Sequence, residues 1–145
     1  MTSHLAALKQ TRRSRKQDEH RLQCAVFQVL HLAGVKDLIA FAVPNGMVSN
    51  AVSVSRMKAA GLLPGVADIA LVLPGGMAAF LELKSGKNAQ TPEQLAFQSR
   101  CYEAGVRYAV ATDFDQAIDV LTKWEVLRIT RVRGLRCEPL REAAE

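Results

Sequence analysis

Two short apolar runs, Ile69-Ala70-Leu71-Val72-Leu73 and Met77-Ala78-Ala79-Phe80-Leu81-Glu82-Leu83, flank the tripeptide Pro74-Gly75-Gly76. Apolar runs of this length around a three-residue loop that contains glycine indicate a β-hairpin. If the loop is centred on Gly75, each residue of the first run faces one residue of the second. The hairpin therefore sets the register for the residues that flank it.

This register brings charged residues together at the open end of the hairpin. Asp68 lies opposite Glu82, and directly opposed residues of an antiparallel pair share one face, with Cβ atoms roughly 4.5–5.5 Å apart. Lys84 is two residues beyond Glu82 and shares that face. A shift of one residue would put Asp68 and Glu82 on opposite faces, so the predicted cluster depends on the register.

The cluster of two carboxylates and one ammonium has two interpretations. Two carboxylates about 4 Å apart repel each other by roughly 4 kcal/mol at an effective dielectric constant of about 20, so a cation is needed between them. Lys84 supplies one in a purely structural ion cluster. Alternatively, Asp68 and Glu82 hold a divalent metal, and hard oxygen ligands favour Mg2+ or Mn2+. Lys84 would then position an attacking water or stabilise negative charge. The spacing alone leaves both interpretations open.

Length and composition narrow the class of protein. The 145 residues are enough for one domain with its own core. No apolar run approaches the ~18 residues of a membrane span, and the basic N-terminus lacks the apolar segment of a secretory signal. The three cysteines have no Cys-x-x-Cys spacing, which argues against a zinc site or a disulfide framework and favours the cytoplasm. The formal net charge of +5 favours a polyanionic partner such as nucleic acid.

Residues 1–17 are expected to form a basic N-terminal arm, and residues 18–33 have the spacing of an amphipathic helix. The basic residues of the arm are Lys9, Arg12, Arg13, Arg15 and Lys16. They are either solvated charge or contacts to phosphates. Glu19 lies at the N-terminal end of the apolar stripe of the helix. It either complements the helix dipole or reaches the hairpin as a third acidic group.

The rest of the pattern predicts alternating helices and strands. Strands are expected at 38–43, at 106–111, where a mostly apolar run favours a central position, and at an edge at 126–129. A helix is expected at 51–60, after a turn at Pro44-Asn45-Gly46 and a cap at Ser49 or Asn50. A final helix is expected to start from a cap at Thr112 or Asp113 and to end at Trp124. A basic tail follows, with Arg128, Arg131, Arg133 and Arg136. This order favours a mixed sheet with helices on both faces.

Thr91-Pro92-Glu93-Gln94 opens the helix that follows the hairpin and that is expected to end at Ala104. Thr91 is the predicted N-cap, Pro92 takes the first helical position and Gln94 completes a capping box. Gln98 lies one turn after Gln94, so either amide could reach a phosphate. The apolar contacts of this helix are expected from Leu95, Phe97, Cys101 and Tyr102.

Asp68, Glu82-x-Lys84 and the preceding helical Glu19 resemble the PD-(D/E)XK nuclease superfamily. More narrowly, the run Gly61-Leu62-Leu63-Pro64-Gly65-Val66-Ala67-Asp68, the Glu82-Leu83-Lys84 segment and Thr91-Pro92-Glu93-Gln94 are similar to the VRR-NUC family, over about residues 19–124. The resemblance implies a restriction-endonuclease-like α/β fold, a mixed β-sheet flanked by helices on both faces. This domain would span residues 18–130, with residues 131–145 as a basic and polar tail.

The same resemblance implies Mg2+- or Mn2+-dependent hydrolysis of phosphodiester bonds in DNA. By position, Asp68 and Glu82 would bind the metal together with the Leu83 carbonyl, and Glu19 would complete the acidic shell directly or through water. Lys84 would activate or orient the attacking water, and Gln94 would support the site. The candidates for contacts to nucleic acid are Arg12, Arg13, Arg15, Lys16, Lys87 and Gln98.

Standalone members of this family are small phage and bacterial enzymes, associated with homodimers and with cleavage of branched DNA. The resemblance therefore implies a homodimer that acts on double-stranded or Holliday-junction-type DNA in the cytoplasm of a bacterial cell or a phage-infected host. The alternative is a nucleic-acid-binding module that is catalytically silent or depends on a partner protein.

Overall fold

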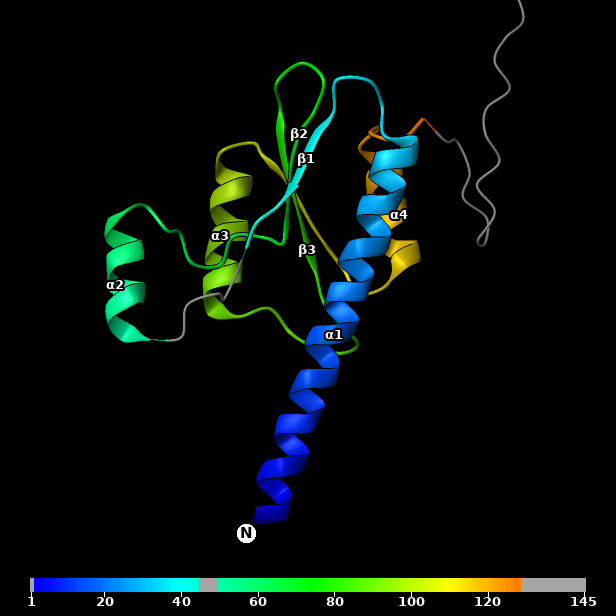
Figure 1. Ribbon diagram of the computed structural model, residues 1–145. Helices are drawn as coiled ribbons and strands as arrows, with labels where there is room; N and C mark the ends of the chain where they lie inside the picture. Colours follow the sequence, from blue (N-terminus) through cyan, green and yellow to red (C-terminus); the bar gives the residue numbers. More distant parts are fainter. Residues whose placement is uncertain (1, 45–49, 129–145) are drawn as a thin grey trace, which may run out of the picture.

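A mixed sheet of four strands lies at the centre of the structure, which is a computed structural model (Figure 1). It describes residues 2–44 and 50–128, with side chains from Thr11 onward except those of Arg12 and Arg13. The strands follow one another across the sheet as β1 (Ile39–Ala42), β2 (Ile69–Val72), β3 (Ala78–Leu83) and β4 (Arg107–Ala111). β2 is antiparallel to β1 and to β3, and β4 is parallel to β3. The helices are α1 (Thr2–Ala33), α2 (Ala51–Ala59), α3 (Pro92–Glu103) and α4 (Phe114–Lys123).

The predicted hairpin and its register are confirmed in β2 and β3. Ile69 pairs with Leu81, and the other pairs of the two strands keep the same register. In the loop, Gly75 has a φ of +93°, a conformation that glycine adopts without the steric penalty of a side chain. One step beyond the last pair of strand residues, this register brings Asp68 opposite Glu82.

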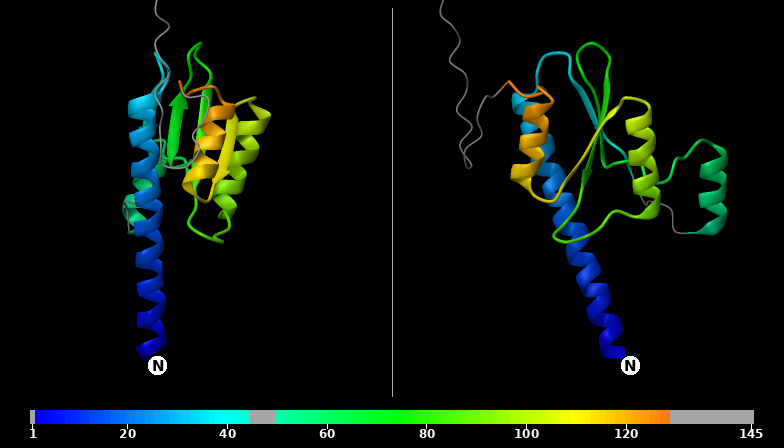
Figure 2. Two further views of the ribbon diagram at one scale, coloured as in Figure 1. Left: turned by 90° about the vertical axis from the view of Figure 1, so that its right-hand side faces the viewer. Right: turned by 180° about the vertical axis from the view of Figure 1, so that it is seen from behind.

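Helices cover both faces of the sheet, as predicted (Figure 2). α1 and α4 lie on one face, where Leu30 and Leu121 contribute to the larger apolar core. α3 lies on the other face, where Phe97 packs edge-on against Phe80 with ring centroids 4.9 Å apart. α2 has no buried residue and stands outside these layers, beyond α3 (Figure 1).

The prediction of a central strand at 106–111 is wrong, because β4 is an edge strand among the four described strands. Its apolar character has another cause: α4 packs against one face of β4 and α3 against the other. Ala111 accordingly belongs to the larger core and Tyr108 to the smaller one. A strand that helices bury on both faces has a nearly continuous apolar sequence, so this pattern alone does not distinguish a central strand from an edge strand.

Helix α1 begins at Thr2, far earlier than the start at residue 18 that the apolar spacing predicted. The residues of α1 that join the core begin only at Leu22. The part of α1 before them projects beyond the sheet and the other helices in every view (Figures 1 and 2). None of the described side chains of this part belongs to a core cluster, and its sequence has no long apolar stripe from which a helix could be predicted.

Smaller differences concern the ends of the chain and the outer face of α3. Phe97 and Cys101 are buried as predicted, but Leu95 and Tyr102 are 52% and 59% exposed, since both lie about 140–160° around the helix from Phe97. In place of an edge strand at 126–129, the described residues show one isolated bridge, from Leu127 to Gly34. Asn45 and the basic residues 131, 133 and 136 lie outside the described residues. Within the described ranges, no helix combines the length and the apolar character that crossing a membrane requires.

Candidate active site

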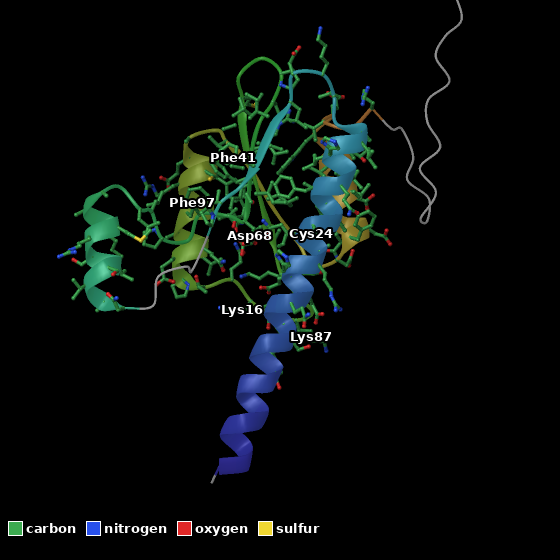
Figure 3. All side chains as sticks on the ribbon, in the orientation of Figure 1. Lys16, Cys24, Phe41, Asp68, Lys87 and Phe97 are labelled. Atoms are coloured by element: carbon green, nitrogen blue, oxygen red, sulfur yellow. The ribbon has the colours of Figure 1, made fainter. Side chains whose placement is uncertain are left out.

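Four segments bring polar side chains to one end of the hairpin, around Asp68 (Figure 3). Asp68 immediately precedes β2, Glu82 lies near the end of β3, and Lys84 follows that strand directly. Gln94 comes from the first turn of α3, and Glu19 comes from the middle of α1. The structure therefore brings together all the predicted catalytic side chains and the predicted acidic residues.

Glu82 is the most buried of these groups, with only 1% of its surface exposed. The Lys84 ammonium lies 2.9 Å from Glu82 Oε1, and the Gln94 side-chain amide donates a hydrogen bond to the same oxygen. The other oxygen, Oε2, is buried and has no hydrogen-bond partner among the described residues. Oε1 of Glu82 thus has two partners, whereas Oε2 is a hydrogen-bond acceptor that is shielded from water.

Burial and neighbouring negative charge both disfavour ionisation of Glu82. Burial and then the negative charge of Asp68 raise its pKa from 4.5 to about 7, against the opposing effect of Lys84, and Glu19 adds a smaller increase. A buried carboxylate without full compensation favours its neutral form. A cation beside Oε2 would reverse this preference.

Asp68 is oriented by the backbone of the neighbouring strand. Its Oδ2 accepts a hydrogen bond from the Leu83 N–H at 2.8 Å, which fixes the carboxylate beside Glu82. Leu83 therefore contacts the predicted site through its N–H. The predicted role of its carbonyl as a metal ligand stays a prediction.

Gln94 forms the predicted cap and also bonds a residue of the predicted site, while its role in catalysis stays a prediction. Its Oε1 accepts from the Thr91 N–H at 2.9 Å, while the Thr91 hydroxyl accepts from the Gln94 N–H at 3.3 Å, so the capping box is confirmed. Its Nε2 is left to bond Glu82. The cap and the site thus share one amide, and the cap fixes where that amide points.

Close backbone packing explains why the start of α3 lies next to the hairpin. Gly65, just before Asp68, has a φ of +82°, and a Cβ added to it would lie 2.2 Å from the Glu93 carbonyl oxygen. Only glycine permits this approach. The segment that leads into β2 therefore rests directly on the first turn of α3, which carries Gln94.

Glu19 reaches the site through the residue that follows Lys84. Its Oε1 accepts hydrogen bonds from the N–H and the hydroxyl of Ser85, at 3.1 and 3.3 Å, and Asn88 Nδ2 donates to the same hydroxyl at 3.2 Å. The helix-dipole interpretation of Glu19 is wrong, because α1 begins at Thr2 and Glu19 is far from its first turn. Glu19 instead ties α1 to the end of β3.

The sequence reasoning missed Ser85, Asn88 and the pair of Gln90 and Tyr108. Gln90 Nε2 donates to the Tyr108 hydroxyl at 3.1 Å, and burial followed by the negative charge of Glu82 raises the pKa of Tyr108. A signal existed for Tyr108, which is a hydroxyl-bearing residue in an otherwise apolar strand. Ser85 gave little signal, because a serine in a polar loop is common.

The candidate contacts to nucleic acid are only partly brought together. Arg15, Lys16 and Lys87 are exposed, and in Figure 3 Lys16 and Lys87 lie between Asp68 and the free end of α1. Gln98 Nε2 donates to the Tyr102 hydroxyl at 3.0 Å, while its Oε1 is buried without a partner in the described part of the chain. The side chains of Arg12 and Arg13 lie outside what the structure describes.

A divalent metal fits the donor set at Asp68 and Glu82. Among the side chains that the structure describes, no three of His, Cys, Asp or Glu form a group that could hold a metal, so these side chains form no closed cage of ligands. Mg2+, however, is commonly held by one or two carboxylates and keeps several waters. The two adjacent carboxylates and the unpartnered Oε2 of Glu82 supply hard oxygen donors of that kind.

Together the fold and the site define an α/β domain with a buried glutamate, an aspartate and a lysine at one end of a hairpin. Two solved structures share this architecture. One is titled "VRR_NUC domain" and is 21% identical, with a TM-score of 0.50 over 72% of this chain and 94% of the other. The second is titled "VRR_NUC domain protein" and is 19% identical, with a TM-score of 0.61 over 73% of this chain and 86% of the other. The predicted fold, that of VRR-NUC proteins, is therefore confirmed. No family model matches the sequence, nor does any curated protein.

Proposed function

We propose that this protein is a metal-dependent nuclease of the VRR-NUC type that hydrolyses phosphodiester bonds in DNA. The observation that carries the proposal is the environment of Glu82. One oxygen binds Lys84 and Gln94, while the other is buried, unpartnered within the described chain and close to the charge of Asp68. A purely structural ion cluster would satisfy both oxygens, because a buried acceptor without a partner costs about 1–3 kcal/mol.

Asp68 and Glu82 would hold Mg2+ or Mn2+, with the Leu83 carbonyl as a further ligand and Glu19 as an outer acidic group. When bound, the ion supplies positive charge to a phosphoryl oxygen and favours deprotonation of water. Gln94 bonds Oε1 of Glu82, which would leave Oε2 available to hold the metal. Glu19 contributes through Ser85, which immediately follows Lys84 in the chain.

Lys84 is the group that would act on the attacking water. Its side chain is only 11% exposed and its ammonium is held 2.9 Å from Glu82, so its position is restricted. An ammonium has three donors; one is used for Glu82, and others are available to orient a water or to stabilise negative charge at phosphorus. Charge stabilisation by such preorganised donors is worth roughly 100- to 1,000-fold in rate.

The proposed substrate is double-stranded or branched DNA, with Arg12, Arg13, Arg15, Lys16, Lys87 and Gln98 as candidate contacts to its backbone. The net charge of +5 agrees with a polyanionic substrate. A homodimer would place two sites about a two-fold axis and cut two related strands of a junction. The cytoplasm of a bacterial or phage-infected cell is the proposed location.

The test is cleavage of linear, nicked, flap and four-way-junction DNA with Mg2+ or Mn2+. We expect Asp68→Asn and Lys84→Ala to lower the cleavage rate by roughly 100-fold or more, while Lys123→Ala, an exposed lysine on α4, leaves it unchanged. Activity retained by both site variants would refute the assignment of the site. Binding without cleavage by the wild type would favour the silent or partner-dependent module instead. Sedimentation of a monomer on junction DNA would refute the dimer.

A further inference from the structure

The N-terminal part of α1 is a single helix that extends well beyond the domain (Figures 1 and 2). At 1.5 Å per residue, Thr2 lies about 26 Å along the axis from Glu19. The residues of α1 that enter the core begin at Leu22. In the projecting part, none of the described side chains, those of Thr11 and of residues 14–18, belongs to a core cluster.

The charge of this projecting segment is unfavourable for a helix. Residues 2–17 contain no aspartate or glutamate, and their lysines and arginines are Lys9, Arg12, Arg13, Arg15 and Lys16. Like charges three or four positions apart destabilise a helix, and the segment holds several such pairs. Arg15 and Lys16 are exposed and form no salt bridge with a described residue. The charge of Arg15 and Lys16 is thus not compensated by a described residue of the domain, and it fits an external polyanion.

Helix geometry aligns part of this charge with the candidate active site. At about 100° per residue, positions 12, 15 and 16 lie within about 60° of Glu19 around the axis, whereas Arg21 lies about 160° away. Lys16, Arg15 and Arg12 follow at about 4.5, 6 and 10 Å along the axis. Glu19 itself bonds Ser85, the residue after Lys84. The three basic positions therefore form a line that leads away from the site in one direction.

We propose that the segment of α1 before Glu19 binds the backbone of duplex DNA on one side of the cleaved bond, so that the substrate footprint is one-sided. This inference rests on the proposed nuclease function. Phosphates of one strand advance about 3.4 Å along the axis of the duplex, so the 10 Å from Glu19 to position 12 corresponds to about three base pairs. A flank of this length is required on one side of the cut and not on the other.

The first test measures affinity for a linear duplex by fluorescence anisotropy in EDTA, at several salt concentrations. The variant Arg12→Gln/Arg15→Gln/Lys16→Gln should reduce the slope of log K against log[salt] by between about 2 and 3, because each lost phosphate contact contributes about 0.9. A matched control, Arg21→Gln/Lys36→Gln/Lys123→Gln, removes the same charge from exposed positions away from the line and should keep the slope. Equal changes in both variants would overturn the proposal. Circular dichroism and the Tm check that each variant is folded.

The second test maps how close to each end of an end-labelled duplex a strand is cut in Mg2+. We expect the wild type and the control variant to leave an uncut zone of about three nucleotides or more at one end, 5′ or 3′, and to cut nearer to the other end. The Arg12/Arg15/Lys16 variant should lose this difference. Uncut zones of equal length at the two ends for the wild type would overturn the proposal.

The two tests separate failure of this inference from failure of the nuclease proposal. A wild type that cuts no DNA with either metal refutes the nuclease proposal and with it the one-sided cut. The salt slopes then still decide whether the α1 segment binds DNA. A wild type that cuts DNA with equal end zones refutes only the one-sided footprint.

Discussion

A buried glutamate that shares its environment with an aspartate is costly unless a cation compensates it. Lys84 provides compensation for only one oxygen of Glu82, since the ammonium and the Gln94 amide both approach Oε1. Removing water from a charged pair often costs more than the pair regains by attraction. The remaining cost is visible in the pKa of Glu82, which is raised to about 7 despite Lys84. We infer that the arrangement suits binding of a cation better than stability of the metal-free fold.

This cost predicts that the metal-free protein loses stability as the pH rises. The folded-state pKa of Glu82 is about 7 and its ordinary value is 4.5, so between these values the folded state binds more protons than the unfolded state. Stability therefore falls as the pH rises through this window, by up to about 3 kcal/mol. Urea unfolding in EDTA at pH 5, 6, 7 and 8 should show the decline.

Glu82→Gln tests the source of the decline, since an amide does not titrate. We expect the stability of the variant to depend little on pH between 5 and 8. Relative to the wild type, the variant should therefore be less destabilised at pH 8 than at pH 5. Asp119→Asn, at an exposed carboxylate on α4, is the control and should keep the wild-type profile. An unchanged profile in Glu82→Gln would show that the decline comes from other groups.

At the residue scale, the sequence could predict the contacts that follow from the hairpin and not those that follow from packing. Asp68 and Glu82 meet because a period of two and a three-residue loop set their register. The bond from Gln94 to Glu82 depends instead on where α3 rests on the sheet, and this depends on the close approach at Gly65. Short-range rules could suggest the cap at Gln94 but could not give the direction of its free amide.

Among the elements, α3 links helix stability to the geometry of the site. Its capping box holds Oε1 of Gln94, which leaves Nε2 directed at Glu82. Loss of the box would let the Gln94 side chain rotate. A capping residue at the start of a helix that does not contact the site would affect only the stability of the protein.

We therefore expect Thr91→Ala and Asp113→Ala to have equal effects on stability and unequal effects on activity. Each removes an N-cap that accepts from the third residue of its helix, which costs about 1 kcal/mol. Only Thr91→Ala should also lower kcat, by roughly 10-fold, because the helix that it caps carries the Gln94 amide that bonds Glu82. Chemical denaturation and cleavage kinetics measure the two quantities. Equal losses of kcat in both variants would show that the cap acts on activity only through stability.

The elements that the sequence misplaced share a physical cause. The apolar spacing predicts too short an α1 because the described side chains of its first half belong to no core cluster, and it predicts a central β4 because helices bury both faces of this strand. Apolar periodicity reports burial and not connectivity. The capped starts of α2, α3 and α4 were predicted well, because a cap depends on residues within one turn.

In the whole molecule, residues far apart in the chain converge where the sheet meets α1 and α3. Glu19 and Ser85 are 66 positions apart. Glu19 comes from α1, which packs in the larger core, whereas Gln94 comes from α3, which packs in the smaller one. The two helix layers thus approach the end of β3 from opposite faces. A ligand that draws Asp68 and Glu82 together would stabilise both layers at once.

This coupling predicts that a divalent metal raises the thermal stability of the whole domain, and more at pH 8 than at pH 5.5. A ligand that binds only the folded state at about 100 times its Kd adds about 2.7 kcal/mol. Protons compete with the metal for Glu82 below its pKa of about 7, so the gain should shrink in acid. Differential scanning calorimetry with about 10 mM Mg2+, which gives high occupancy, and with EDTA, which removes the metal, measures the gain. Asp68→Asn and Glu82→Gln should lose the gain while Asp119→Asn keeps it. If Mg2+ does not change the Tm of the wild type at pH 8, or if it raises the Tm of Glu82→Gln by as much as that of the wild type, the metal does not bind at the unpartnered oxygen of Glu82.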